Sequence, residues 1–130
     1  MFRFFKRRKA IKNFVCKLPL ELHRRFGDKR FYLLEQVERI LENGKYDRAF
    51  SAYAIALLCS RNDFDGYFGE LKLKCSYDSL RKFVAKKYIN GIIDFDASSL
   101  VRFAKGVGDK SYYESNLADN ASNSSSSGHH

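Results

Sequence analysis

The chain has 130 residues, 45% of them hydrophobic, with twelve Phe and eight Tyr, so it can bury one sizeable core and gives no sign of a second domain. A single Pro, no Trp and three cysteines without a closely spaced pair argue against a loop-rich or disulfide-stapled protein and predict reduced thiols. The net charge of +9 comes from the first thirty residues, which hold eleven of the 24 basic and two of the 15 acidic side chains.

Three helices are predicted in the N-terminal part of the chain. Residues 2–16 have apolar side chains at helical spacing and basic ones elsewhere, which is typical of a basic amphipathic helix. Pro19 suits the first turn of a short second helix, and Gly27 suits its C-terminal position. A third helix is expected over about 32–43, with Asn43 and Gly44 ending it.

The next predicted helix, over about 46–60, is apolar on almost every side. A helix of this kind is normally surrounded by other elements, so we expect it at the centre of the core. Phe50, Tyr53 and Leu57 should then be almost fully buried. Residues 61–69 contain turn-forming residues and two glycines and are predicted to form a loop, while 70–75 fit either a helical turn or a short strand.

The C-terminal part predicts two more helices and a tail. Ser76 or Asp78 should begin a helix that ends at Tyr88, before Asn90-Gly91, and Asp96 should begin a last helix that ends at Gly106. Residues 107–130 are interpreted as a flexible tail that includes a tag remnant. The fold class is therefore all-α: a basic helix over 1–16 and a core domain over 17–106, together one small domain of five or six helices packed around 46–60.

No segment is predicted to cross a membrane. The longest apolar stretch, 49–59, is shorter than the roughly 20 residues that span a bilayer. The basic N-terminus also lacks the continuous apolar region of a secretory signal, because Asn13, Lys17 and Pro19 interrupt it. We expect a cytoplasmic protein and leave peripheral attachment to a membrane open.

Catalytic and metal-binding patterns are scarce. His23 is the one histidine outside the tail, so sites that need two imidazoles are excluded, and a capping or solvated role is expected for it. Asp63 and Asp65 resemble part of a calcium loop, but the twelfth position, normally Glu, would be Lys72. We therefore predict no metal, no cofactor and no catalytic residue. A small enzyme that uses His23 or the Asp63 and Asp65 loop remains an alternative.

The basic N-terminal segment is the predicted binding site. Cations alternate there with aromatic rings, so they could follow a phosphate backbone while the rings stack on bases, or pair with lipid headgroups while the rings enter the interface. The other interpretation is that the helix docks on the body through Phe4, Ile11, Phe14 and Val15 and leaves its cations solvated. The candidate residues are Phe2, Arg3, Phe4, Phe5, Lys6, Arg7, Arg8, Lys9 and Lys12.

Several short stretches together resemble a family of small uncharacterised bacterial proteins. The resemblance covers about residues 17–105 and implies a bacterial, cytoplasmic protein, but it supplies no activity, ligand or catalytic residue. The stretches are Leu18-Pro19, Arg25-Phe26-Gly27, Tyr53-Ala54, Cys59-Ser60, Phe64-Asp65, Leu80-Arg81, Tyr88-Ile89-Asn90-Gly91 and Asp94-Phe95-Asp96.

The sequence thus favours a non-enzymatic binding or accessory module. Its alternatives are nucleic-acid binding through the basic segment, attachment of that segment to an anionic membrane, and a small enzyme. The partner is expected to be a nucleic acid, a membrane surface or another protein, and the sequence leaves the oligomeric state open.

Overall fold

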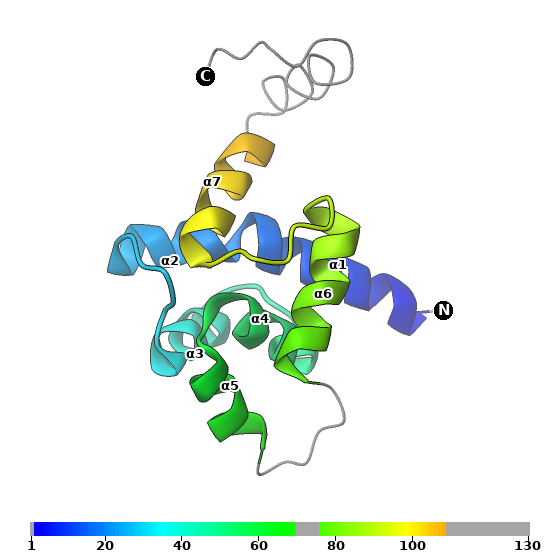
Figure 1. Ribbon diagram of the computed structural model, residues 1–130, viewed down its shortest axis with the longest axis horizontal. Helices are drawn as coiled ribbons and strands as arrows, with labels where there is room; N and C mark the ends of the chain where they lie inside the picture. The colour runs from blue at the N-terminus through cyan, green and yellow to red at the C-terminus, as the bar shows by residue number, and fades with distance from the viewer. Residues whose placement is uncertain (1, 70–75, 109–130) are drawn as a thin grey trace.

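The first two helices lie in line across the molecule. The computed structural model describes residues 2–69 and 76–108, with side chains from Phe5 to Gly106, and places α1 over Phe2–Cys16 and α2 over Leu18–Phe26 (Figure 1). Backbone hydrogen bonds from Lys17 to Asn13 and from Glu21 to Lys17 continue the helical pattern across the joint. Gly27, at φ +86°, ends α2 in a conformation that other residues rarely adopt, as its position predicts.

The basic helix α1 is docked into the core. Ile11, Phe14 and Val15 are buried together with Ala10, in the same cluster as the buried residues of α4. This confirms the expectation of a docked helix for these residues, whereas the side chain of Phe4 lies outside the described ones. Removal of α1 would expose this apolar surface to water, so α1 is part of the folded body.

The central segment differs from the expected single helix over 46–60. A 3-10 helix, η1 (Arg48–Phe50), comes first and α4 (Ser51–Leu58) follows it, after α3 (Leu34–Asn43). The side chain of Asp47 accepts a hydrogen bond from the Ala49 N–H and so begins η1. The prediction of deep burial is confirmed for Leu57 and is wrong for Phe50 and Tyr53, which are half-buried because they precede the fully enclosed stretch 54–59.

The predicted loop over 61–69 is a helix instead. In α5 (Arg61–Phe68) the side chain of Ser60 accepts a hydrogen bond from the Asp63 N–H, which begins the helix. Phe64 and Phe68 lie one turn apart with ring centroids 4.8 Å from each other, and both are buried. Phe64 also packs 5.6 Å from Tyr77. These aromatic contacts stabilise a helix that Gly66 and the aspartates disfavour on their own.

The last two helices begin where the sequence predicts; the first of them also ends there, whereas the last continues to Gly108, past its predicted end at Gly106. Ser76 accepts a hydrogen bond from the Ser79 N–H at the start of α6 (Tyr77–Tyr88). Asn90 and Gly91, both at positive φ, end it. Asp96 accepts hydrogen bonds from the Ser99 N–H and hydroxyl at the start of α7 (Ala97–Gly108). Residues 70–75 lie outside the described ones, so the choice between helix and strand there stays open.

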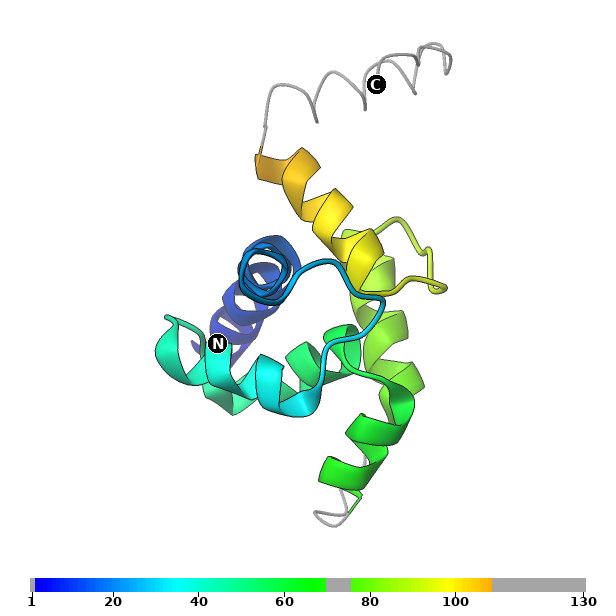
Figure 2. The same ribbon diagram turned by 90° about the vertical axis from the view of Figure 1, so that its left-hand side faces the viewer.

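The arrangement is all-α, which confirms the predicted fold class; no strand occurs in 2–69 or 76–108. α4 lies at the centre and packs against α1, α3, α5 and α6, while α7 packs against α1 and α2 on the other side of the molecule (Figures 1 and 2). The carbonyl of Leu58 at the end of α4 accepts a hydrogen bond from the Tyr32 N–H, and that of Cys59 accepts one from the Tyr77 hydroxyl. The predicted central helix is therefore confirmed, in a shorter form.

Candidate functional site

One flank of α1 presents a row of polar side chains to solvent. Lys6, Lys9, Asn13 and Lys17 follow one another at intervals of three or four residues, so they lie above each other on the helix, beside the buried Ala10 and Phe14. The three lysines are exposed, and α1 contains no acidic residue. From Lys6 to Lys17 the row extends about 16 Å, at 1.5 Å per residue.

The turn between α3 and η1 faces this row. Figure 2 shows α1 nearly end-on, beside that turn. Two adjoining cavities of about 510 and 360 Å³ lie between them and share Asn13, Lys45 and Tyr46. These cavities are called the basic groove, and the acidic Glu21 and Asp47 are among the residues that line it. Its basic and neutral polar side chains are Lys6, Lys9, Asn13, Lys17, Arg24, Lys45 and Tyr46.

Tyr46 holds the turn against the helices. Its ring stacks on Phe14, with centroids 6.1 Å apart and planes 26° apart. Its hydroxyl donates a short hydrogen bond to Glu21. Burial first, and then this hydrogen bond, raise the pKa of Tyr46, so its hydroxyl stays protonated. Gly44 permits this contact, because a Cβ on that residue would lie 2.5 Å from the Tyr46 ring.

The acidic residues of the groove already have partners, whereas most of its cations form no ion pair with a described residue. Glu21 binds Tyr46 and lies 3.7 Å from Arg24, and the Asp47 carboxylate caps η1. Lys6, Lys9, Lys17 and Lys45 are exposed and form no ion pair within the described part of the chain. The groove therefore keeps an unbalanced positive charge that is available to an anion.

The other candidates from the basic segment are spread around α1. Arg7 is half-buried with its guanidinium 5.1 Å from the centre of the Phe83 ring on α6, while Phe5, Arg8 and Lys12 are exposed outside the groove. The side chains of Phe2, Arg3 and Phe4 lie outside the described ones. Of the predicted site residues, Lys6 and Lys9 therefore line the groove.

The sequence interpretation missed the other groove residues. The spacing that joins Lys6 and Lys9 to Asn13 and Lys17 is visible in the sequence and could have extended the site. No sequence signal relates Lys45 and Tyr46 to α1, because a turn more than 30 residues away reaches the helix only in the folded chain.

The residues of the enzymatic alternative do not meet. His23 is on α2 and Asp63 and Asp65 are on α5, and both views place α3 between these two helices (Figures 1 and 2). Nδ1 of His23 is buried and lacks a hydrogen-bond partner among the described atoms. Asp63 lies in the first turn of α5, where its backbone N–H donates to the side chain of Ser60.

Neither metal-ligand clusters nor membrane spans occur in the described residues. Within 2–69 and 76–108, no three His, Cys, Asp or Glu side chains are grouped so that they could hold an ion. In the same ranges no helix has the length and apolar character needed to cross a bilayer.

Comparisons with known proteins identify the family of the chain. No curated protein and no solved structure matches it significantly. The model of one family, described as a family of unknown function (DUF6559), matches residues 1–130. The resemblance to an uncharacterised family is thereby confirmed, and the chain belongs to the family DUF6559.

Proposed function

We propose that this protein is a non-enzymatic binding module whose basic groove holds the phosphate backbone of a nucleic acid. The observation that supports this most is the row of exposed lysines along α1, opposite Lys45, in a groove whose acidic residues are already engaged. Lysine side chains neutralise phosphates without reading bases, so binding should depend steeply on salt and little on sequence.

The length of the groove suits a short stretch of backbone. About 16 Å along α1 corresponds to roughly five nucleotides at 3.4 Å of axial rise per nucleotide. The stacked rings of Tyr46 and Phe14 set the distance between the turn and α1, so the two sets of cations face one another without rearrangement of the fold. Binding would therefore order the lysine side chains without a cost for rearranging the backbone.

The burial of the apolar side of α1 makes a membrane-inserted helix the weaker alternative. Insertion of Ile11, Phe14 and Val15 into lipid would require α1 to leave the core. The lysines alone could still attract anionic headgroups, by about 1 kcal/mol for each near the surface. Anionic vesicles therefore belong in the same test.

The test compares two double variants of equal charge. Lys9→Ala with Lys45→Ala removes one cation from each side of the groove, whereas Lys82→Ala with Lys86→Ala removes two exposed cations from α6. Binding of fluorescent 20-nucleotide DNA and RNA, single- and double-stranded, is measured by anisotropy over a salt series. The groove variant should weaken binding and reduce the slope of log K against log[salt] by about 1.8 on duplex, at about 0.9 per phosphate contact.

Two results would contradict the proposal. One is equal loss of binding in the groove variant and the α6 variant, which would indicate a diffuse effect of net charge. The other is the absence of nucleic-acid binding at about 0.15 M salt, where screening removes weak attraction. If vesicles of phosphatidylserine bind and nucleic acids do not, the groove serves a membrane surface instead.

A further inference from the structure

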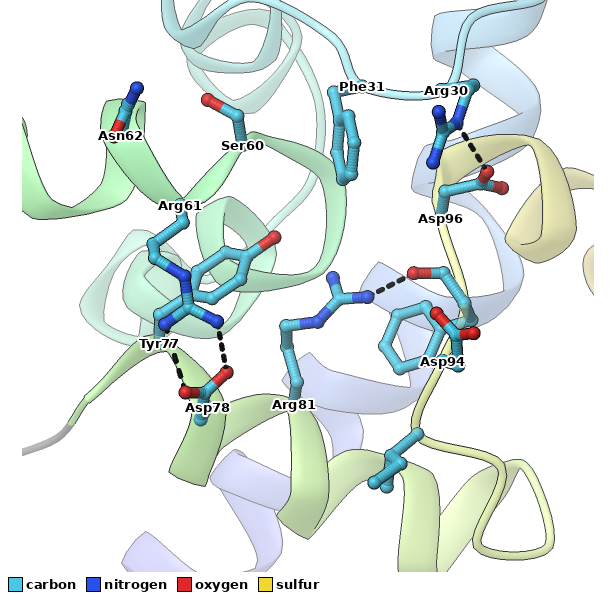
Figure 3. Close-up of a pocket in the computed structure, with 12 residues that line it drawn as sticks. Arg30, Phe31, Ser60, Arg61, Asn62, Tyr77, Asp78, Arg81, Asp94 and Asp96 are labelled. Atoms are coloured by element: carbon cyan, nitrogen blue, oxygen red, sulfur yellow. Dashed lines mark hydrogen bonds and ion pairs between the residues drawn. The ribbon is translucent and has the colours of Figure 1, made fainter.

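A second pocket lies among α5, α6 and the segment that precedes α7 (Figure 3). It shares no lining residue with the basic groove. Its volume of about 650 Å³ falls within the roughly 300–1,000 Å³ of pockets that hold small ligands. Residues 30–31, the start of α5, the first turns of α6 and residues 93–96 line it, so four separate stretches of chain converge there.

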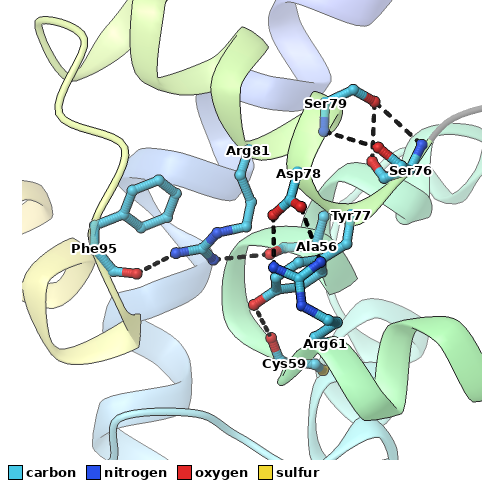
Figure 4. Close-up of polar contacts among 9 residues, drawn as sticks. All are labelled: Ala56, Cys59, Arg61, Ser76, Tyr77, Asp78, Ser79, Arg81 and Phe95. Atoms are coloured by element: carbon cyan, nitrogen blue, oxygen red, sulfur yellow. Dashed lines mark hydrogen bonds and ion pairs between the residues drawn. The ribbon is translucent and has the colours of Figure 1, made fainter.

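Arg81 forms the floor of this pocket and is only 8% exposed. Its guanidinium donates to the carbonyls of Ala56 at 3.0 Å and Leu57 at 3.4 Å, and to that of Phe95 (Figure 4). A guanidinium has five N–H donors, so two remain without a partner among the described residues. No described carboxylate forms an ion pair with Arg81, whose guanidinium lies 3.9 Å from the centre of the Phe95 ring. Burial lowers the pKa of Arg81 by more than Tyr77, Asp78 and Asp94 raise it, because burial of a charge is costly.

The other charged groups of the pocket are unequally engaged. Arg61 holds Asp78 through two hydrogen bonds of 2.8 and 2.9 Å. Arg30 binds Asp96 through Nε alone, at 3.2 Å, and its two terminal nitrogens make no hydrogen bond within the described part of the chain. Asp94 is exposed and forms no ion pair there. Arg30 therefore has N–H donors available to a ligand, and Asp94 is a carboxylate that forms no ion pair with a described residue.

Aromatic rings complete the pocket. The half-buried Phe31 stands at its edge between Ser60 and Arg30, and Tyr77 lies at the opposite side, beside Arg61 (Figure 3). The Tyr77 hydroxyl is fixed by its hydrogen bond to the Cys59 carbonyl. Tyr77 is buried, and the guanidinium groups of Arg61 and Arg81 lie 5.0 and 5.1 Å from the centre of its ring. Phe31 is therefore the ring of this pocket that a flat ligand can contact.

We propose that this pocket binds a small organic anion that has a flat ring with an N–H donor. The anionic group, a carboxylate or a phosphate, lies at the available N–H groups of Arg81 and Arg30 and forms the ion pair that Arg81 does not make with any described carboxylate. The ring lies against Phe31, and its N–H donates to Asp94. Arginine suits this task because its fork of donors matches planar oxyanions.

The experiment uses the four nucleoside 5′-monophosphates as probes, because each combines a phosphate with a flat base that has an N–H donor. Calorimetric titration of the full chain should show binding of at least one of them with a Kd of about 1 mM or below. Inorganic phosphate and the matching nucleoside, tested separately, should each bind at least about tenfold more weakly, because each lacks half of the recognised features.

Variants locate the site. Arg30→Gln and Asp94→Asn change exposed side chains and leave the buried Arg81 in place; each should weaken binding by about tenfold, the effect of one charge-assisted hydrogen bond. Arg39→Gln, an exposed arginine outside this pocket, is the matched control and should have no effect. The variant Lys9→Ala with Lys45→Ala should also bind normally, which separates this pocket from the basic groove.

Three results would overturn the proposal. The first is no binding of any nucleoside monophosphate at about 10 mM. The second is equal binding of inorganic phosphate alone, which would show that the ring is not recognised. The third is a loss of binding in the lysine variant that matches or exceeds the loss in Arg30→Gln.

Discussion

The lysines of the basic groove are exposed and lack ion pairs in the described part of the chain, whereas the arginines around the second pocket are held by carboxylates or carbonyls. Exposed cations act over a distance and are screened by salt, while a buried guanidinium acts through short hydrogen bonds that salt hardly affects. The same kind of charge is therefore left without an ion pair among the described residues in the basic groove, and it holds chain segments together around the second pocket. Substitution of groove lysines should therefore leave the free energy of unfolding almost unchanged, whereas substitution of Arg81 should lower it.

The largest expected effect on stability is at Arg81, in the second pocket. Arg81→Ala leaves the carbonyls of Ala56, Leu57 and Phe95 buried without their donor and should lower the free energy of unfolding by about 3–5 kcal/mol. Urea denaturation followed by circular dichroism measures this change. A loss below about 1 kcal/mol would mean that Arg81 does not join the end of α4 to the segment before α7. The contrast between a structural arginine in the pocket and unpaired lysines in the groove would then be wrong.

A smaller effect is expected at the start of α7. Asp96→Ala removes the helix cap and should cost about 1 kcal/mol at pH 7. Burial raises the pKa of Asp96, but hydrogen bonds from Ser99 and Arg30 outweigh it and lower the pKa. Because the folded-state pKa is the lower one, the stabilisation is complete above the unfolded value of about 3.9 and is lost as the pH falls through the folded one.

The pH dependence provides the control for this variant. Unfolding of the wild type and of Asp96→Ala is followed from pH 7 to pH 2, and the difference between them should shrink in the acid range. A difference that stays constant with pH would mean that the carboxylate charge contributes nothing to the cap.

The smallest effect on stability is expected in the basic groove. Lys9→Ala with Lys45→Ala should change the free energy of unfolding by less than about 0.5 kcal/mol, because both side chains are exposed and form no ion pair with described residues. Urea denaturation of the same samples that are used for nucleic-acid binding tests this. Destabilisation by more than 1 kcal/mol would show that the groove lysines also stabilise the fold, and the comparison between the two regions would no longer hold.

Much of the fold follows from local signals that the chain contains. Ser76 and Asp96 begin helices, and Gly27 and Asn90-Gly91 end them, because their side chains or positive φ angles satisfy helix ends without help from distant residues. The apolar spacing of α1 likewise predicts which side of that helix is buried. Local chemistry of this kind is visible in a sequence.

The two errors in the predicted elements depend on where each segment lies relative to the core, which no local pattern shows. The stretch 61–68 contains Gly66 and aspartates and is weakly helical alone, but Phe64 packs against Phe68 and against Tyr77 at the start of α6. The observed α4 is shorter than the helix predicted over 46–60. The first residues of that stretch lie at the edge of the core, where Phe50 and Tyr53 remain partly exposed.

The sequence by itself determined the all-α class, most helix ends and the basic N-terminal segment, since each depends on neighbours within a few residues. Only the tertiary structure decided that Lys45 faces α1 and that Arg81 is buried beneath a pocket. A lysine or arginine on a helix or turn is normally solvated, and nothing local distinguishes one that faces a groove or the carbonyls of another helix. That difference depends on which elements pack together, because proximity in the folded chain determines the electrostatic surroundings of each charge.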